Sequence, residues 1–429
     1  MNFRSRVYKL PWHFSYSAAY FCQFCCPYDL SADVAAAPTF AAAGRLLMAC
    51  CPHFSIDLSG PLCFDRRGLL WLLRGTRRPG RIEERFYVMG SQASPLPDLF
   101  ALPTHGGDLL GAEARFGRPP AGWLDLSTGI SPFAYPLPTL APECWQRLPD
   151  RDREDRVRRV AAAAYGVSGP DQVVMAAGSQ AIIQALPRLR APSRVAVVGP
   201  TYAEHAACWT QGGHQLSLVE TLERAGDAEV AIVVNPNNPD GRRHDRRRLQ
   251  ALANDMAGRG GLLIVDEAFG DLDPTLSMAP EVRPGLLVLR SFGKFFGLAG
   301  LRLGFALAEP SLARALQSAL GPWPVNGPAL AVGEIALADH AWIASARGRL
   351  HREAGLLDGI LTAAGLQVTG GTDLFRLVNA PRAWALYEHL GHNGILVRPF
   401  AAAPRWLRVG LPPGEQARAR LQQALAAWV

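Results

Sequence analysis

The sequence predicts an α/β fold with a mostly parallel sheet in a large domain, together with a smaller α+β domain. Between residues 170 and 308, short and continuous apolar runs alternate with helical patterns, which is typical of a parallel sheet covered by helices. Side chains with special chemistry follow these runs directly, where ligands bind at the carboxyl ends of parallel strands. The chain has 429 residues and is 49% hydrophobic, which is enough for a large core.

The expected elements begin with a helix over residues 153–167 that ends at Gly166. The large domain continues with strands that are bounded by turn residues, and the first two of them are followed by a helix. These strands are expected within five stretches: 171–189, 194–213, 230–241, 260–271 and 285–308. The last of these stretches holds two strands on either side of a Gly-rich loop.

The C-terminal part of the chain shows a different pattern. A long helical stretch over 328–366 is followed by strands in LFRLV, ILVRPF and WLRVGL, which indicates the smaller α+β domain. We therefore expect four parts along the chain: a poorly structured N-terminal extension (1–95), the N-terminal part of the small domain (96–165), the large domain (166–325) and the C-terminal small domain (326–429).

Residues 1–88 differ from the rest because they show no sustained periodicity and hold six of the eight cysteines. We expect a disordered extension, or sequence upstream of the true start, for which Met89 is a plausible position. The cysteine spacing fits no common zinc pattern, so no metal site is predicted, and reduced thiols in the cytoplasm are the default. The chain also lacks an apolar run of 18 residues and a clear cleavage site, so neither a transmembrane helix nor a signal peptide is expected.

The net charge of +7 does not by itself indicate a nucleic-acid or membrane partner. Arginines are scattered along the chain, and the one dense run, at 241–250, contains Asp245 and looks like the start of a solvated helix. Lysine, in contrast, occurs only at Lys9 and Lys294. An amine in the loop RSFGKFFGLAGLRLGF therefore suggests chemistry that arginine cannot perform, because only lysine can lose its proton and form a Schiff base.

Pyridoxal phosphate is the cofactor that this pattern predicts. Besides a lysine it requires a carboxylate at its pyridine nitrogen, an aromatic face, a donor near its phenolic oxygen and a cradle for its phosphate. Asp266 follows an apolar strand and suits the nitrogen, Tyr202 suits the ring face, and Asn238 suits the phenolic oxygen. The cradle is expected from a helix start and from two residues that flank the lysine: Gly178, Ser179, Gln180, Ser291 and Arg302.

Each of these residues taken singly has an ordinary alternative. Asp266 suits a helix cap, Tyr202 suits core packing, and the residues around Asn238 suit a simple turn. The order of the motifs is more specific. GSQ, TY, NPNNP, DEA and S-x-x-K with an arginine eight residues later follow one another, and from about residue 103 the chain resembles the fold-type I pyridoxal-phosphate enzymes of the class I/II aminotransferase superfamily.

This resemblance implies that Lys294 binds the cofactor and acts in catalysis, and that the other positions have the roles given above. It also implies a homodimer with sites at the subunit interface. Two members of the superfamily share these motifs: histidinol-phosphate aminotransferase and threonine-phosphate decarboxylase, an enzyme of cobalamin biosynthesis. The segments THGGDLLGAEARFG (104–117) and WLDLSTGISPFAYPLP (123–138) resemble the decarboxylase, as does Phe269 in DEAFGD, where aminotransferases usually carry a tyrosine.

The resemblance thus implies decarboxylation of L-threonine O-3-phosphate to (R)-1-amino-2-propanol O-2-phosphate. A histidinol-phosphate or related aminotransferase is the alternative within the superfamily. A non-catalytic binding or regulatory protein of the same fold is the alternative of another class. That reading expects a helix-turn-helix domain before the fold, and residues 1–100 show no such helical pattern.

The resemblance also implies four substrate-binding residues: His105, Gly129, Arg398 and Arg408. Arg408 matches the arginine that grips the amino-acid carboxylate, because a guanidinium fits a carboxylate with two hydrogen bonds. Arg398 and His105 would meet the anionic phosphate end of the substrate. Two positions depart from the family's pattern: Leu148 stands where many relatives lend a tyrosine to the partner subunit's phosphate site, and Ser131 replaces a commoner asparagine.

Overall fold

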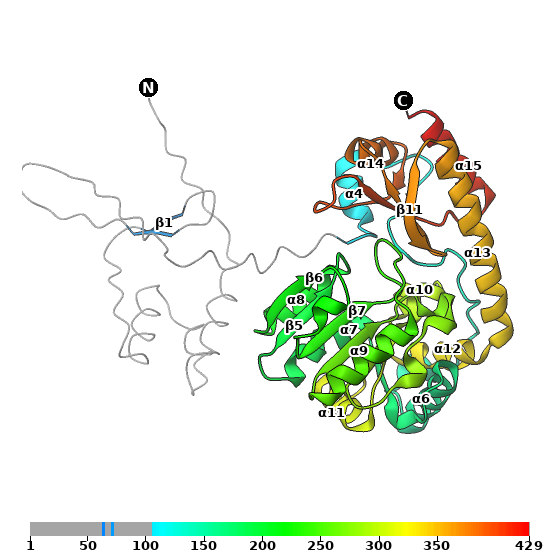
Figure 1. The fold of residues 1–429 in the computed structure, drawn as a ribbon. Coiled ribbons are helices and arrows are strands. Elements are labelled where there is room, and N and C mark those ends of the chain that lie inside the picture. Colours follow the sequence, from blue (N-terminus) through cyan, green and yellow to red (C-terminus); the bar gives the residue numbers. More distant parts are fainter. Residues whose placement is uncertain (1–61, 65–69, 73–104, 429) are drawn as a thin grey trace, which may run out of the picture. The chain divides into compact units, whose positions relative to one another are not determined.

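The structure, a computed structural model of the chain, describes residues 62–64, 70–72 and 105–428. The chain divides into two compact units, Met1–Ala101 and Leu102–Val429. In the first unit, β1 (Leu62–Phe64) pairs antiparallel with β2 (Leu70–Leu72). The predictions of a poorly structured extension and of a start at Met89 otherwise lie outside the described residues. Figure 1 shows the elements of the second unit.

A seven-stranded sheet forms the centre of the large lobe (Figure 1). Its strands are β4 (Val173–Ala176), β5 (Arg194–Val198), β6 (Gln215–Val219), β7 (Val230–Val234), β8 (Leu262–Asp266), β9 (Leu286–Ser291) and β10 (Gly304–Leu307). They stand in the order β4-β10-β9-β8-β7-β5-β6, in which β10 runs antiparallel to both neighbours and all other pairs are parallel. The mostly parallel sheet predicted from the sequence is confirmed.

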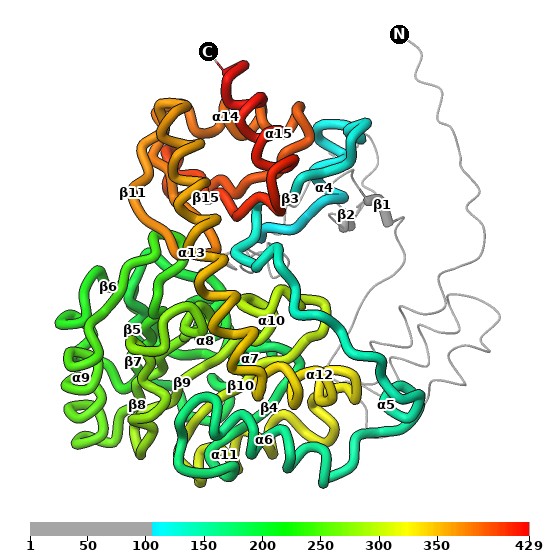
Figure 2. The backbone as a smooth tube through the Cα atoms, turned by 90° about the vertical axis from the view of Figure 1, so that its right-hand side faces the viewer, coloured from blue at the N-terminus to red at the C-terminus, as the bar shows by residue number. Residues whose placement is uncertain are grey.

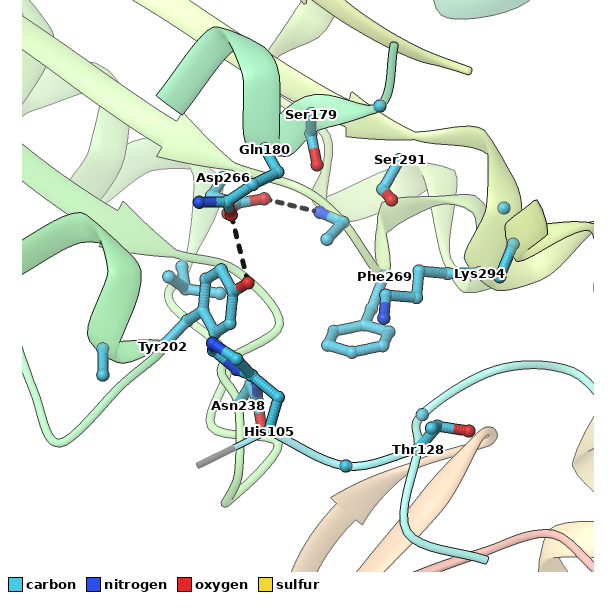
Figure 3. A pocket seen from close by; sticks show the side chains of 18 of the residues that line it. His105, Thr128, Ser179, Gln180, Tyr202, Asn238, Asp266, Phe269, Ser291 and Lys294 are labelled. Carbon is cyan, nitrogen blue, oxygen red and sulfur yellow. Dashed lines mark hydrogen bonds between the residues drawn. The ribbon is translucent and has the colours of Figure 1, made fainter. Parts of the chain in front are cut away.

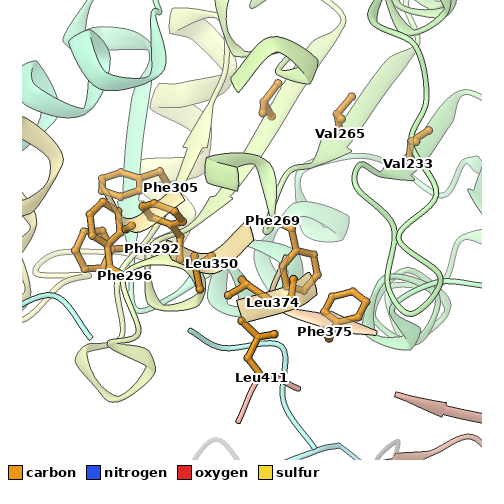
Figure 4. Close-up of a cluster of buried hydrophobic side chains, with 14 of the residues drawn as sticks. Val233, Val265, Phe269, Phe292, Phe296, Phe305, Leu350, Leu374, Phe375 and Leu411 are labelled. Atoms are coloured by element: carbon orange, nitrogen blue, oxygen red, sulfur yellow. The ribbon is translucent and has the colours of Figure 1, made fainter. Parts of the chain in front are cut away.

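Apart from the edge strand β6, both faces of this sheet are buried, which explains why the other strands are mostly continuous apolar runs. Successive side chains of a strand point to opposite faces, so they alternate between two hydrophobic clusters. In β7, Ala231 and Val233 belong to one cluster, whereas Val230 and Ile232 belong to the other. Figure 4 shows side chains of the first cluster, which includes Val233 and Val265 of the sheet together with phenylalanines such as Phe269 and Phe375.

Helices cover both faces of the sheet. One face carries α6 (Arg151–Tyr165), α9 (Arg246–Gly258) and α12 (Gly327–Ala338), and the other carries α7 (Ser179–Ala185), α8 (Ala203–Gln211) and α11 (Pro310–Leu320). Helix α6 ends as predicted at Gly166, whose left-handed φ of 72° lets its N–H bond back to the last turn. Asp245 caps α9 by accepting from two backbone N–H groups, so the arginine-rich run is the helix start that the sequence predicted.

The small lobe is a four-stranded antiparallel sheet with helices beside it. Its strands, in the order β11-β12-β15-β14, are β11 (Gln367–Thr372), β12 (Phe375–Asn379), β15 (Trp406–Gly410) and β14 (Arg398–Pro399). Its helices are α4 (Leu109–Phe116), α13 (His340–Ala363), α14 (Ala383–His392) and α15 (Glu415–Ala426). A parallel pair, β3 (Leu124–Asp125) with β13 (Ile395–Leu396), joins the N-terminal segment to this lobe.

The long helical stretch expected over 328–366 is divided into α12 and α13 at Asp339. This residue leaves the helical conformation, and its side chain accepts from the backbone N–H of Trp342 and from the hydroxyl of Tyr135 at 3.1 Å. Helix α12 therefore packs in the large lobe, while α13 runs from there into the small lobe (Figure 2). Among the helices of the described residues, none is long and apolar enough to cross a membrane.

A buried charge cluster ties the end of β9 to the loop that follows β8. Arg290 is only 3% exposed, and its Nη1 donates to Glu267 Oε2 at 2.8 Å while its Nη2 donates to Asp271. Glu267 also accepts from Ser277 Oγ at 2.6 Å and from a backbone N–H. Buried charges are tolerated only when they are paired and hydrogen-bonded, so this cluster holds the loop to the strand end that leads to Lys294.

Replacing Arg290 with methionine should destabilise the fold strongly, because two buried carboxylates would lose their cation. We expect the free energy of unfolding to fall by about 3–5 kcal/mol, measured by urea denaturation. The exposed pair of Arg156 and Glu334, 3.1 Å apart, offers a control, and Arg156→Met should cost about 1 kcal/mol or less. Equal losses in the two variants would contradict the role given to the buried cluster.

Candidate active site

One cavity of about 310 Å³ is lined by residues of both lobes. Figure 3 shows Lys294 pointing toward the open centre of this cavity, with Asp266 and Tyr202 across from it. The cavity brings together all the residues predicted from the sequence: His105, Gly129, Gly178, Ser179, Gln180, Tyr202, Asn238, Asp266, Ser291, Lys294, Arg302, Arg398 and Arg408. Their individual roles stay predictions.

The predicted cofactor-binding residues of the large lobe lie at or near the ends of strands of the seven-stranded sheet. Asp266 is the last residue of β8, Ser291 is the last residue of β9, and Lys294 follows within the short helix α10 (Phe292–Phe295). Gly178 comes shortly after β4, and Tyr202 comes shortly after β5. Because these strands share one sheet, residues that are far apart in sequence converge on one cavity.

The side chain of Lys294 is buried, and its pKa is lowered from 10.5 to about 8. Burial is the main cause, the guanidinium groups of Arg408 and Arg302 add to it, and the carboxylate of Asp266 opposes it. A substantial share of the amine is therefore uncharged at mildly basic pH, and the uncharged amine is the form that attacks an aldehyde. The backbone carbonyl of Lys294 accepts from the N–H of Ser131 at 2.9 Å, which joins the lysine loop to the loop after β3.

Aromatic packing beneath the lysine fixes the course of its loop. The rings of Phe292 and Phe296 stack with centroids 4.2 Å apart, and Phe296 also stacks on Trp342 of α13. Gly297 has a left-handed φ of 66°, and a Cβ there would lie 2.8 Å from Cα of Ala134. The loop is thus Gly-rich because its backbone passes in contact with the segment that follows β3.

Asp266 is supported by a histidine that the sequence analysis missed. His205 of α8 is 1% exposed, and its Nε2 lies 2.8 Å from Oδ2 of Asp266. The other oxygen of Asp266 accepts from the N–H of Ala268 at 2.9 Å, within a turn and not at a helix start, since the next helical turn begins at Gly270. A carboxylate with this support is held in one orientation at the edge of the cavity, and can pair with a protonated ring nitrogen.

A glycine and an arginine shape the predicted phosphate cradle. Gly178 has a φ of 85°, and a Cβ at this position would lie 2.5 Å from Nη2 of Arg302. Arg302 itself adopts a left-handed φ of 58°, and its guanidinium donates to the carbonyls of Ala177 and Ala299. No side chain caps the start of α7 at Ser179, and a helix start of this kind favours an anion.

Tyr202 belongs to a chain of polar contacts along one wall. Its hydroxyl donates to Gln180 Oε1 at 3.1 Å, and the amide of Gln180 donates to Glu204 Oε2 at 2.7 Å. The other oxygen of Glu204 lies 3.2 Å from Nε2 of His105. Burial, followed by the nearby carboxylates of Glu204 and Asp266, raises the pKa of Tyr202, so its phenol stays neutral. Glu204 was not predicted, because its partners come from distant parts of the chain.

Arg408 on β15 connects the two lobes at the floor of the cavity. Its Nη1 donates to Asn238 Oδ1 at 2.6 Å and its Nη2 donates to the backbone carbonyl of Ser127 at 2.7 Å. Burial lowers its pKa to about 10, helped by the charge of Arg398 and opposed by that of Asp125, so it stays a cation at neutral pH. The contact also engages the oxygen of the Asn238 amide, which leaves its NH₂ group as the donor that the predicted role requires.

Arg398 and Phe269 complete the walls. Arg398 stands opposite Arg408 in the β14–β15 pair, with its guanidinium 5.4 Å from the centroid of the Phe400 ring. Phe269 is 3% exposed and meets Phe375 edge-on at a centroid distance of 5.1 Å. A Cβ at Gly129 would lie 3.1 Å from the Phe269 ring, so the glycine lets the loop pass directly over it. This wall of the cavity is therefore apolar at Phe269.

The two positions that depart from the family's pattern lie outside the residues lining the cavity. The hydroxyl of Ser131 stays within its own loop, where it donates to the carbonyl of Phe133 at 3.1 Å and accepts from its N–H at 3.2 Å. Leu148 is 65% exposed. Within the described part of the chain, no three His, Cys, Asp or Glu side chains are grouped to hold a metal ion, and Cys144 and Cys208 are free thiols.

The fold and this cavity define an aminotransferase-like protein, and the comparison with known families agrees. Residues 140–425 match the aminotransferase class I and II family. The chain belongs to this family. In this α/β fold, ligands bind at the carboxyl ends of the strands. Asp266 at the end of β8 and Lys294 shortly after β9 lie in that region.

Among curated proteins, the chain is 47% identical over 325 residues to a threonine-phosphate decarboxylase from Pseudomonas aeruginosa, covering 75% of this chain and 96% of that protein. It is 31% identical over 317 residues to a histidinol-phosphate aminotransferase from Mycobacterium bovis, covering 70% and 82% of the two chains. A solved structure of histidinol-phosphate aminotransferase from Sinorhizobium meliloti, in complex with pyridoxal-5'-phosphate, has a TM-score of 0.63 at 21% identity and covers 79% of this chain and 100% of that chain.

Replacing Lys294 with methionine should make the cofactor-free protein more stable, and most so below about pH 8. Folding lowers the pKa of Lys294 from 10.5 to about 8, so burying the charged amine lowers the free energy of unfolding. This destabilisation is fully present below pH 8, where the amine is charged in both states, and it disappears as the pH rises to about 10.5. The stability difference between the variant and the wild type, measured by urea denaturation, should shrink by about 2 kcal/mol between pH 7 and pH 10. A difference that does not change with pH would mean that the pKa is not lowered.

Proposed function

We propose that the protein is a pyridoxal-phosphate-dependent carboxy-lyase that converts L-threonine O-3-phosphate to (R)-1-amino-2-propanol O-2-phosphate, a step of cobalamin biosynthesis. The observation that carries the proposal is the 47% identity with a threonine-phosphate decarboxylase over 96% of that protein's length. The identity with a histidinol-phosphate aminotransferase is 31% over 82% of its length. The charges and the walls of the cavity support the same reaction.

The donor set of the cavity fits pyridoxal phosphate. Asp266, with His205 behind it, would hold the pyridine nitrogen, and Tyr202 would cover the ring. The space beside Gly178 and Arg302, which a Cβ would fill, would take the phosphate. When bound, the cofactor supplies a conjugated ring that accepts the electron pair left behind as carbon dioxide departs.

The remaining positive groups fit a substrate with an anion at each end. Arg408 would take the carboxylate in a paired hydrogen bond, and Arg398 stands next to it across the strand pair. His105, whose side chain is 45% exposed, stands near Tyr202 on the solvent side of the cavity. A phosphate group carries a charge of about −2 at neutral pH, so the two arginines would offset most of the negative charge of a phosphorylated amino acid, and His105 could form a hydrogen bond with it.

Lys294 would hold and return the proton that the product requires at Cα. In the free protein, burial is the main cause that lowers the pKa of Lys294, and the charge of Arg408 adds to it. A substrate carboxylate bound to Arg408 would offset that charge, and the proton affinity of the amine would rise. Binding of the substrate therefore prepares the lysine to hold a proton close to the carbon that loses carbon dioxide.

The purified protein, supplied with pyridoxal phosphate, should release carbon dioxide and aminopropanol phosphate from L-threonine O-3-phosphate without any keto-acid. Carbon dioxide trapping and mass spectrometry of the product measure this. Lys294→Arg keeps the charge but not the reactive amine, and should lower the rate by about 10²–10⁴-fold. A keto-acid-dependent product without carbon dioxide would instead indicate an aminotransferase, and the absence of either turnover would favour a binding protein.

We further propose that the protein forms a homodimer through the surface around α5 (Glu143–Gln146). Three large apolar side chains in the stretch 137–148 are widely exposed, among them Trp145 at 68%. Trp323, at 54%, precedes Gly327, where a Cβ would lie 2.2 Å from the Cys144 carbonyl, so the two exposed tryptophans belong to adjoining segments. Apolar side chains gathered in this way are typical of protein interfaces.

A charge placed on this surface should separate the subunits. Trp145→Glu is expected to shift the molar mass measured by light scattering from that of a dimer to that of a monomer at micromolar concentration, because it puts a charge into an apolar interface. Leu218→Glu is the matched control, since Leu218 is 69% exposed on the edge strand β6. A monomeric wild type, or a dimer that survives Trp145→Glu, would contradict this proposal.

A further inference from the structure

Ser127, which does not line the cavity, makes a hydrogen bond with each of its polar groups. It is 2% exposed, and its hydroxyl and backbone N–H both donate to Asp125 Oδ1, at 2.6 and 2.8 Å. The hydroxyl oxygen accepts from the backbone N–H of Gly107 at 2.7 Å. The backbone carbonyl accepts from Nη2 of Arg408 at 2.7 Å. One buried residue thus contacts both the segment that carries His105 and the arginine on β15.

The segment 105–107 lies directly on Ser127. A Cβ at Gly106 would lie 2.3 Å from the Ser127 carbonyl oxygen, and Gly107 adopts a φ of 88° that favours glycine. His105 precedes these two glycines and lines the cavity (Figure 3). The imidazole of His105 meets Glu204 at 3.2 Å, whereas the backbone of the segment is held by the hydrogen bond from Gly107 to the Ser127 hydroxyl, because the two glycines have no side chains to anchor it.

The neighbours of Ser127 hold the other anion-binding elements. The N–H of Leu126 donates to the carbonyl of Leu396 in β13, two residues before Arg398, and the carbonyl of Leu126 accepts from the N–H of Gly410, two residues after Arg408. The negative charge of Asp125 also favours the charged form of Arg408. Residues 125–127 therefore form a short bridge between the two arginines and the segment of His105.

We propose that Ser127 is a positioning residue that fixes the spacing between Arg408 and His105, and thereby selects amino acids that carry a phosphate at a set distance from the carboxylate. The inference rests on the function proposed above. Asp125 orients the serine, because it accepts the hydroxyl proton and so leaves the oxygen lone pairs for the N–H of Gly107. The Ser127 hydroxyl holds the segment of His105, which would meet the phosphate of the substrate. The Ser127 backbone carbonyl holds Arg408, which would meet the carboxylate.

Ser127→Ala separates these two actions, since it removes the hydroxyl and keeps the carbonyl. We expect the KM for L-threonine O-3-phosphate to rise about tenfold and kcat to change less than twofold. The inhibition constant of unphosphorylated L-threonine, which lacks the distal anion, should stay within twofold of the wild-type value. Ser131→Ala is the matched control, because Ser131 is a buried serine of the same loop whose hydroxyl bonds only within that loop, and it should change neither constant.

Two further measurements distinguish positioning from a general structural effect. In hydrogen exchange followed by mass spectrometry, the peptide that contains Gly107 should exchange at least about tenfold faster in Ser127→Ala and unchanged in Ser131→Ala. In a double-mutant cycle, Ser127→Ala should have little further effect on KM once His105→Ala is present, because both changes remove the same contact to phosphate. Multiplicative effects of the two substitutions on KM would overturn the proposal.

The outcomes separate this inference from the proposed function. If the wild type does not decarboxylate L-threonine O-3-phosphate, the proposed function fails; the exchange of Gly107 still tests the contact. If the wild type is active and Ser127→Ala behaves like Ser131→Ala, the inference about Ser127 fails alone. Asp125→Asn serves as a second variant should Ser127→Ala not fold. It removes the charge that supports Arg408, so it should weaken the binding of both the phosphorylated and the unphosphorylated amino acid, and unchanged binding would count against the bridge.

Discussion

The buried pairing of Arg290 with Glu267 and Asp271 is the constraint on which the geometry of the site depends. Glu267 directly follows Asp266, and Arg290 directly precedes Ser291, so the cluster joins the two strand ends that carry the carboxylate and the lysine loop. Apolar contacts are not directional, so by themselves they would define the relative position of the loop after β8 and the lysine loop less well. Charges in a dry interior have few acceptable arrangements, because a displaced partner is left unpaired at a high cost.

Charge balance inside the cavity depends on the same burial. Both Arg408 and Lys294 have lowered pKa values, to about 10 and about 8, chiefly because each is removed from water. The cation of Arg408 adds to the shift of Lys294, whereas Asp266 moderates it. An anionic substrate would relieve the excess of positive charge. The affinity for an anion and the reactivity of the amine are thus two consequences of one enclosed group of cations.

The sequence could predict the fold class and the cavity because most of the predicted residues of the large lobe end or closely follow a continuous apolar strand. It could not predict His205, Glu204 or Ser127, since these residues act through contacts with partners that only the sheet brings near. His205 carried one weak signal, because it lies on the first turn of α8, three residues after Tyr202. The sequence analysis did not predict the break between α12 and α13 at Asp339. A single aspartate within a helical pattern does not show by itself whether its side chain caps a new helix or points to solvent.

The choice between losing carbon dioxide and losing a proton depends on few side chains. A histidinol-phosphate aminotransferase shares this fold at 21% identity and a TM-score of 0.63, so the backbone does not decide the reaction. The bond that breaks is the one held perpendicular to the ring, and its orientation follows from how the substrate is held. In this chain the guanidinium of Arg408 is fixed by Asn238 and by the Ser127 carbonyl, while the segment of His105 is fixed by the Ser127 hydroxyl. The orientation of Arg408, which the Ser127 carbonyl and Asn238 fix, would set how the carboxylate is turned at Cα, so the protein, rather than the ring, would determine which bond is aligned.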